Sequence, residues 1–258
     1  VPRLERKTQS SKSVKWWKGY AEIISALQIK AFRTLCLGFI FFTVMAGITT
    51  ALALYFMSYF WEFTQAQSMY ILIAMGLAVI PGAIFTPIIQ KIFDKKGGAI
   101  IALVFYALIY CTPIMLRLLG VMPENHTSNL FYLMLLFYFS GQIFVMIGLI
   151  LSESMMADVT DKYELETENK QEGLLYSATM FARKASFGIG GFFAGIILDI
   201  VRFPVKTDPG EVDLSILWNL GATVIPVVLL LQLTSAFFFK IYPITRSTHE
   251  KTITSLNK

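Results

Sequence analysis

The fold of this chain is decided by residues 152–199, SESMMADVTDKYELETENKQEGLLYSATMFARKASFGIGGFFAGIILD, which join two very apolar segments through an acidic stretch. The second apolar segment carries Arg183 and Lys184 in its middle. Charged side chains inside an apolar span are costly, so they usually mark a functional site. Both the class of fold and the place to look for function follow from this stretch.

The composition is typical of a membrane protein. Of the 258 residues, 55% are hydrophobic and only 15% are charged, and the mean hydropathy is +0.62. The apolar residues fall in long runs, which predict an all-α membrane protein surrounded by lipid. The net charge of +5 does not indicate a nucleic-acid partner, because the basic residues lie at the ends of the runs.

Six transmembrane helices are predicted, each near the roughly 20 residues that cross the hydrocarbon core. They are 34–60, 68–90, 99–119, 130–156, 173–200 and 215–240. They form a six-helix bundle over 34–240, between a basic segment at 1–33 and a tail at 241–258.

The distribution of basic residues predicts the orientation. An even number of spans puts both ends on one side. That side carries the N-terminal segment together with Lys91, Lys95, Lys96, Lys162, Lys170, Lys240, Arg246, Lys251 and Lys258, and the other side carries Arg117, Arg202 and Lys206. The positive-inside rule makes the first side cytoplasmic, so both termini are predicted in the cytoplasm.

Residues 1–33 are polar and basic and leave two interpretations open. Trp16, Trp17, Tyr20, Ile23, Ile24 and Leu27 recur at helical spacing. This pattern predicts a helix lying in the membrane interface, with its lysines towards the phosphates. The alternative is a disordered basic tail. Because the chain starts at Val1, we expect it to be a piece of a longer polypeptide.

Lys184 is predicted to lie near the middle of the bilayer. It follows the start of the fifth span, near Glu172, by about 11 or 12 residues, or roughly 17 Å of helix. Lys184 and Arg183 are therefore expected to face protein or a wet cavity and to need acidic partners. Glu153 is one candidate partner for either basic residue. The other candidates are carboxylates in a part of the protein absent from this chain, and we favour these for Lys184. A helix that starts later would instead bring both residues near the surface.

Two further groups of residues stand out near the fifth span. Gly188, Gly190, Gly191 and Gly195 recur on one helix, with Gly191 and Gly195 at the spacing of small residues that predicts close helix packing. Asp158, Asp161 and Glu164 lie in the predicted cytoplasmic loop and admit two uses. They either pair with basic residues of a neighbouring helix end or bind Mg²⁺ in a six-span membrane enzyme. Asp94, in the loop joining the second and third spans, lies beside Lys95 and Lys96.

These motifs together resemble the glycoside–pentoside–hexuronide:cation symporter family, the melibiose-carrier-like branch of the major facilitator superfamily. The resemblance is carried by MADVTD (156–161), Tyr163-Glu164, QEG (171–173), Tyr176-Ser177 and FARK (181–184), and by the loop motif DKKG (94–97). It covers nearly the whole chain and matches the C-terminal half of these carriers.

The resemblance implies a secondary transporter, not an enzyme, with 12 helices in two halves and no cofactor beyond a coupling cation, Na⁺ or H⁺. A small-molecule substrate and the cation would bind between this half and an N-terminal six-helix half. Transport would proceed by alternating access, in the bacterial inner (plasma) membrane. The substrate- and cation-coupling residues would be Lys184, Arg183, Thr179 and Tyr176. Asp158, Asp161, Glu164 and Asp94 would form the cytoplasmic gate.

Two departures from the family pattern affect the substrate. Sugar-carrying members tend to have Gln-Thr one turn before the lysine, where this chain has Thr179 and Met180. An aromatic residue that such members place in span ten is here Leu149. Polar groups and a stacking ring are what a sugar site needs. The expected substrates therefore include, besides a sugar or glycoside, a more apolar solute. A half-length membrane protein without transport activity is the remaining alternative.

Overall fold

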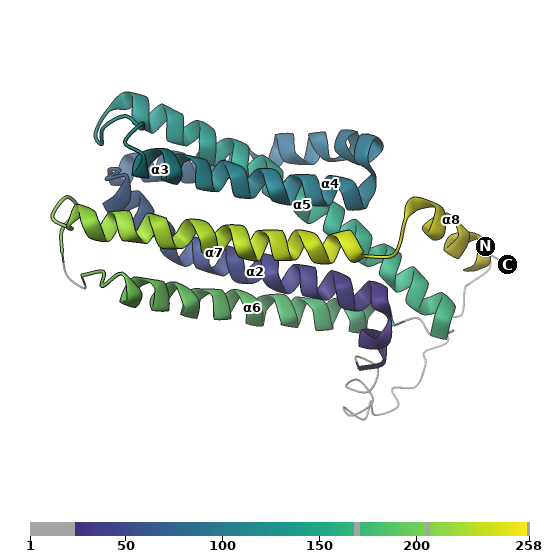
Figure 1. Cartoon of the computed structure of the whole chain (residues 1–258). Helices are drawn as coiled ribbons and strands as arrows, with labels where there is room; N and C mark the ends of the chain where they lie inside the picture. Colours follow the sequence, from purple (N-terminus) through teal and green to yellow (C-terminus); the bar gives the residue numbers. More distant parts are fainter. Residues whose placement is uncertain (1–23, 168–170, 205–206, 257–258) are drawn as a thin grey trace, which may run out of the picture.

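The computed structural model describes residues 24–167, 171–204 and 207–256, and all regular structure in these ranges is helical. This confirms the predicted all-α class. Five helical stretches of the described chain are long and apolar enough to cross a membrane: Lys30–Phe60, Gln65–Leu118, Ser128–Thr167, Glu172–Ile200 and Leu214–Ile241. They lie side by side as a bundle (Figure 1).

The first stretch consists of α2 (Lys30–Tyr55) and a final π-helical turn, η1 (Phe56–Phe60). The next helix, α3 (Gln65–Leu77), begins with a capping box. The Thr64 backbone N–H donates to the Gln67 side chain at 2.9 Å, and the Gln67 N–H donates back to the Thr64 hydroxyl at 3.3 Å. Reciprocal bonds of this kind satisfy N–H groups that have no partner within the helix.

The fourth helix, α4 (Val79–Leu118), reverses direction at Asp94, whose backbone is non-helical with φ 61° and ψ 171°. A Cβ added to Gly98 would lie 3.0 Å from the Ile89 side chain. Nine residues along a straight helix would separate these positions by roughly 13.5 Å. The chain therefore turns back on itself (Figure 1). The predicted loop between the second and third spans is reduced to one non-helical residue.

The remaining helices are α5 (Ser128–Thr167), α6 (Glu172–Ile200), α7 (Leu214–Ile241) and α8 (Arg246–Leu256). Helix α5 continues to Thr167, beyond the predicted end of the fourth span at residue 156, so the acidic residues that follow this span stand on a helix. Residues 152–167 contain neither glycine nor proline, so nothing in the backbone stops the helix there.

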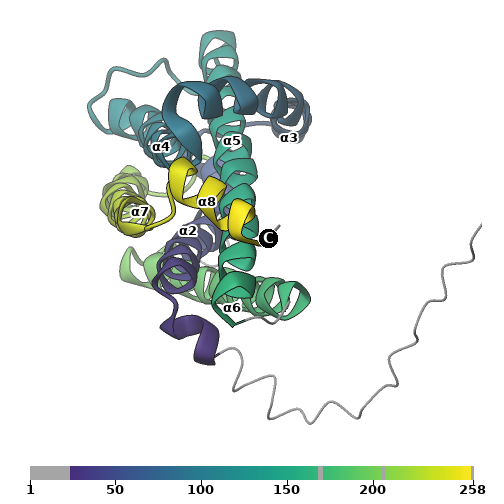
Figure 2. The same cartoon turned by 90° about the vertical axis from the view of Figure 1, so that its right-hand side faces the viewer.

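Helix α2 lies at the centre of the bundle, packed against α6 and α7 (Figure 2). Buried polar groups also join α7 to its neighbours. The Ser235 hydroxyl donates to the Gly38 carbonyl of α2 at 2.8 Å, and the Gln232 amide donates to the Leu103 carbonyl of α4 at 3.0 Å. Both donors are buried, so these bonds offset the cost of removing them from water.

The close crossing between α2 and α6 is made by Gly47 and Gly190. A Cβ added to Gly190 would lie 2.2 Å from the Val44 carbonyl oxygen, and one added to Gly47 would lie 2.2 Å from the Phe187 carbonyl oxygen. By contrast, a Cβ added at Gly188, Gly191 or Gly195 would meet no described atom within 4 Å. Of the four glycines predicted to allow close packing, Gly190 makes this crossing, and the role of the other three stays a prediction. The spacing of glycines along the sequence does not say which face of α6 packs against another helix.

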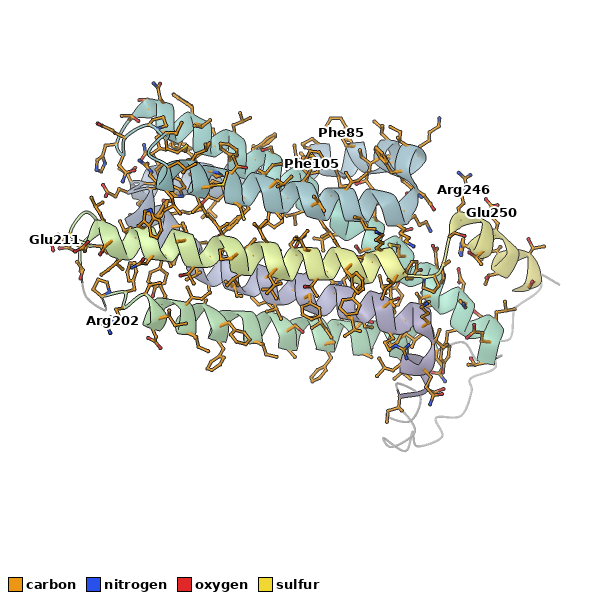
Figure 3. The ribbon with its side chains drawn as sticks, viewed as in Figure 1. Phe85, Phe105, Arg202, Glu211, Arg246 and Glu250 are labelled. Atoms are coloured by element: carbon orange, nitrogen blue, oxygen red, sulfur yellow. The ribbon has the colours of Figure 1, made fainter. Side chains whose placement is uncertain are left out.

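The surface of the bundle exposes large apolar side chains, among them Leu54 (70%), Phe181 (76%) and Leu214 (80%). Charged residues lie at its ends: Arg202 and Glu211 at one, Arg246 and Glu250 at the other (Figure 3). Lipid or another apolar protein surface suits such a molecule, and water does not.

The structure bears on the two predicted terminal segments to different extents. Most of the predicted interfacial helix lies outside the described residues. Within them, residues 24–28 are helical and Ile24 is 62% exposed. The predicted C-terminal tail contains α8, which packs against α5 beside the reversal of α4 (Figures 1 and 2).

Candidate functional site

Helix α6 holds the first candidate cluster. It begins at Glu172, as predicted, so Lys184 lies 12 residues, or about 18 Å, along it. Lys184 is exposed in this chain, and no hydrogen bond or ion pair joins it to any residue that the structure describes. A charged amine at this depth needs a carboxylate or a wet cavity beside it.

Arg183, the residue before it, is neutralised within the chain. Its guanidinium forms an ion pair with the Glu153 carboxylate of α5 and lies 4.6 Å from the centre of the Phe39 ring of α2. The Arg183 side chain is 17% exposed and that of Glu153 is 43% exposed. Sequence reasoning named Glu153 as one of two alternatives for the partner, and the structure selects it for Arg183.

Tyr176 and Thr179 lie one to two turns before these charges. Tyr176 is half-buried and packs against the core. Thr179 is 3% exposed; its hydroxyl donates to the Leu175 carbonyl at 2.9 Å and lies 3.8 Å from the Cys36 sulfur of α2. Its position fits packing between α2 and α6, and its place in the coupling site stays a prediction.

The second cluster lies at the end of the bundle that carries α8. Lys95, directly after the reversal of α4, donates to the Asp158 carboxylate of α5 at 2.6 Å. The imidazole of His249 in α8 lies 3.5 Å from the same carboxylate oxygen. Asp158 is only 6% exposed. One buried carboxylate thus holds three elements together.

Neighbouring contacts reinforce this junction. The Lys96 ammonium donates to the Tyr242 carbonyl at 2.8 Å, and the Tyr242 hydroxyl donates to the Met155 carbonyl at 3.0 Å. Burial, and to a smaller extent the negative charge of Asp158, raise the pKa of the Tyr242 phenol, so it stays a neutral donor. A cavity of about 420 Å³ lies between the reversal, α5 and α8.

The other predicted gate residues surround this junction. Asp94 accepts from the Lys95 backbone N–H at 2.8 Å and lines the 420 Å³ cavity. Asp161 and Glu164 lie one and two turns beyond Asp158 on α5, both half-buried. They stand on a helix and not in the predicted loop. Among the described residues, no group of three or more His, Cys, Asp or Glu could hold a metal ion.

Sequence reasoning missed His249 and Tyr242. Both belong to a segment predicted only as a tail, and their partners lie far away in the sequence. The one available signal was composition, since the chain has only two histidines and one of them stands in a polar segment beside a span end.

Five helical stretches of the described chain, long and apolar enough to cross a membrane, define the broad class, a helical membrane protein. The chain belongs to the MFS/sugar transport protein family, whose model matches residues 1–246. The predicted resemblance to the melibiose-carrier-like branch is thereby confirmed. It is a family of transporters, so the chain is not an enzyme, and the Mg²⁺-dependent alternative is excluded.

Two relatives illustrate the likeness. Over 109 residues the chain is 31% identical to an uncharacterized symporter of Synechocystis sp., covering 41% of this chain and 20% of the relative. Over 176 residues it is 26% identical to the Escherichia coli (strain K12) protein named "Putative glycoside/cation symporter YagG", covering 68% of this chain and 36% of the relative. The matched part of the chain thus spans well under half of either relative.

Proposed function

We propose that this chain is the C-terminal half of a 12-helix symporter that couples uptake of a sugar, glycoside or other small organic solute to a cation. The reversal at Asp94 divides one of the five apolar stretches in two, which gives six passes. Family membership and the glycoside/cation symporter among the relatives support the proposal. Alternating access of two such halves around a midplane site is the mechanism that fits this architecture.

The observation that carries the proposal is the contrast between Arg183 and Lys184. Arg183 is satisfied by Glu153 and Phe39 within the chain. Lys184, on the same helix turn, is exposed without a partner among the described residues. Its partners are assigned to carboxylates of the N-terminal half. In this mechanism Lys184 neutralises those carboxylates until Na⁺ or H⁺ takes its place, which frees the groups that organise the substrate.

The junction at Asp158 is assigned to the cytoplasmic gate. Lys95 and His249 share its carboxylate, so movement of α5 against α4 or α8 has to break charged contacts. Asp94, Asp161 and Glu164 line the same end. This end is assigned to the cytoplasm of the cell's inner membrane, with both termini on that side, because most basic residues lie there.

The test uses the full-length carrier in proteoliposomes, with uptake measured under an imposed Na⁺ or H⁺ gradient. Replacing the amine in Lys184→Ala is expected to reduce gradient-driven accumulation at least tenfold, and Lys184→Arg should retain part of it. Lys240→Ala, which removes an exposed lysine at the end of α7, is the control and should transport normally. Undiminished coupled uptake in Lys184→Ala would overturn the proposed role of Lys184.

A further inference from the structure

The cavity of about 420 Å³ between the reversal of α4, α5 and α8 holds more basic than acidic residues. The basic residues in its lining are Lys91, Lys95, Lys96 and Arg246, and the acidic ones are Asp94, Asp158 and Glu250. Counting these side chains alone, one positive charge is in excess. An anion with a single negative charge would balance the cavity.

The carboxylates of the cavity do not compensate its cations evenly. Lys95 pairs with Asp158, and Arg246 pairs with Glu250 at 3.2 Å. Lys91 is exposed, and no hydrogen bond or ion pair joins it to any residue that the structure describes. The charge of Lys91 is therefore available to a ligand.

The other lysine of the reversal is also only partly engaged. The Lys96 ammonium donates to the neutral Tyr242 carbonyl, and an ammonium group has two further N–H donors. Asp94, between these lysines in the sequence, accepts from the Lys95 backbone N–H. Its carboxylate can offset the charge of Lys91 or of Lys96 but not of both. The excess positive charge thus lies at the reversal of α4.

The cavity lies at the depth of the lipid headgroups. From the reversal at Asp94, α4 continues to Leu118, which is about 36 Å of helix. Asp158 lies about 45 Å from the start of α5 at Ser128. The hydrocarbon core is about 30 Å thick, or about 40–45 Å with both headgroup regions. Helices that enter the hydrocarbon at its opposite boundary therefore bring this cavity to the level of lipid phosphates.

An exposed apolar stripe on α4 leads from the membrane core to Lys91. Ile80, Ile84 and Ile88 are all exposed, and their spacing of four residues puts them on one face of the helix. Lys91 follows Ile84 by seven residues, or two turns, and lies on that face. An acyl chain along the isoleucines would bring its headgroup to Lys91. A soluble anion would make no use of this stripe.

We propose that this cavity binds the phosphodiester headgroup of an anionic membrane phospholipid, with one acyl chain along Ile80, Ile84 and Ile88. Lys91 and Lys96 bind the phosphate, whose single negative charge matches the excess in the cavity. Basic pockets at the ends of transmembrane helices are typical sites for such headgroups. Because Arg246 of α8 also lines the cavity, the lipid joins α8 to α4.

The experiment titrates lipid into the full-length carrier, purified in a non-ionic detergent, and measures the first bound lipid by native mass spectrometry. The probes are dioleoylphosphatidylglycerol, dioleoylphosphatidylcholine and glycerophosphoglycerol. The second has the same phosphodiester beside a compensating positive charge, and the third is the first headgroup without acyl chains. Phosphatidylglycerol is expected to bind at least fivefold more tightly than either of the other probes.

Variants at two exposed lysines connect this binding to the cavity. A basic residue near the membrane surface changes the affinity for an anionic lipid about fivefold. Lys91→Gln should therefore weaken phosphatidylglycerol binding about fivefold, and Lys91→Glu should weaken it further. Lys240→Gln and Lys240→Glu change a lysine in the last turn of α7 that is outside the cavity lining, and they should bind normally. Both lysines are exposed, so all four variants should keep the same thermal unfolding midpoint.

Three outcomes would overturn the proposed lipid site. Equal weakening by the Lys91 and Lys240 variants would show a general effect of charge and not a site in this cavity. Equal binding of phosphatidylcholine would contradict selection of an anionic headgroup. Glycerophosphoglycerol bound as tightly as the lipid would make the ligand a soluble phosphodiester. Since binding is measured without a solute or a gradient, each outcome leaves the proposed transport function standing.

Discussion

Arg183 and Lys184 show how neighbouring residues on one helix take different roles. Successive side chains point about 100° apart around a helix. Arg183 therefore meets Glu153 and Phe39 inside the bundle, while Lys184 faces out of this chain. One charge is compensated locally and the other is kept for a partner elsewhere. The two basic residues proposed to take part in coupling therefore lie on a single turn of α6.

The ion pair between Arg183 and Glu153 is expected to stabilise the bundle. Because Glu153 is 43% exposed, solvent screening limits the coupling energy to about 1 kcal/mol. Glu153→Gln, Arg183→Gln and the double variant in a double-mutant cycle of denaturant unfolding in micelles would measure it. Single losses that simply add in the double variant would show that the two side chains do not interact.

Gly190 and Gly191 allow a matched test of the helix crossing. A Cβ at Gly190 would collide with the Val44 carbonyl, a backbone atom that cannot move alone, whereas one at Gly191 meets nothing within 4 Å. Gly190→Ala is therefore expected to destabilise the protein by about 1–3 kcal/mol. Gly191→Ala should be neutral or slightly stabilising, since alanine favours helix.

Thermal unfolding of the two purified variants in the same detergent makes the comparison. Equal midpoints for Gly190→Ala and Gly191→Ala would contradict the assignment of the α2–α6 crossing to Gly190.

At the scale of whole elements, α8 contacts the bundle at the buried Asp158 carboxylate of α5. His249 reaches the Asp158 carboxylate, which Lys95 already neutralises. By contrast, Glu250 pairs with Arg246 of its own helix, and both are exposed. Among the described contacts, attachment of α8 therefore depends on the face of the helix that carries His249.

His249→Ala is expected to loosen α8. Loss of the contact to Asp158 should cost about 1 kcal/mol of local stability, which corresponds to roughly fivefold faster amide exchange. Hydrogen-exchange mass spectrometry over residues 246–256 measures this effect. Glu250→Ala, which leaves the Asp158 junction intact, is the control; equal acceleration in both variants would rule out a special role for His249.

The sequence predicted what depends on local pattern and missed what depends on distant contacts. The apolar runs predicted the long helices. The position of Lys184 along α6 followed from the predicted start of that helix near Glu172. The crossing of Gly47 with Gly190 and the contact of His249 with Asp158 join residues far apart in the chain. Helical periodicity places a residue on its own helix only. It carries no information on which neighbour that face will meet.

At the scale of the whole molecule, the asymmetry of basic residues predicts opposite accessibility of the two ends. Glu211 and Glu250 lie at opposite ends of the bundle (Figure 3). In a full-length background with Cys36 and Cys111 replaced by alanine, Glu211→Cys should react with a membrane-impermeant maleimide in intact cells. Glu250→Cys should react only after the cells are permeabilised. The reverse pattern would invert the proposed topology.

Because α5 is long, a small tilt of this helix moves its far end by a large distance. Its 40 residues span about 60 Å, twice the hydrocarbon thickness of about 30 Å. Asp158 stands on the protruding part, about 45 Å from the start of the helix. With no break in the helix, a tilt of about 5° about the bilayer midplane swings Asp158 by roughly 2.5 Å. That displacement is as large as the 2.6 Å separating it from the Lys95 ammonium. A small rotation inside the membrane is thereby magnified into a motion that parts two charges outside it.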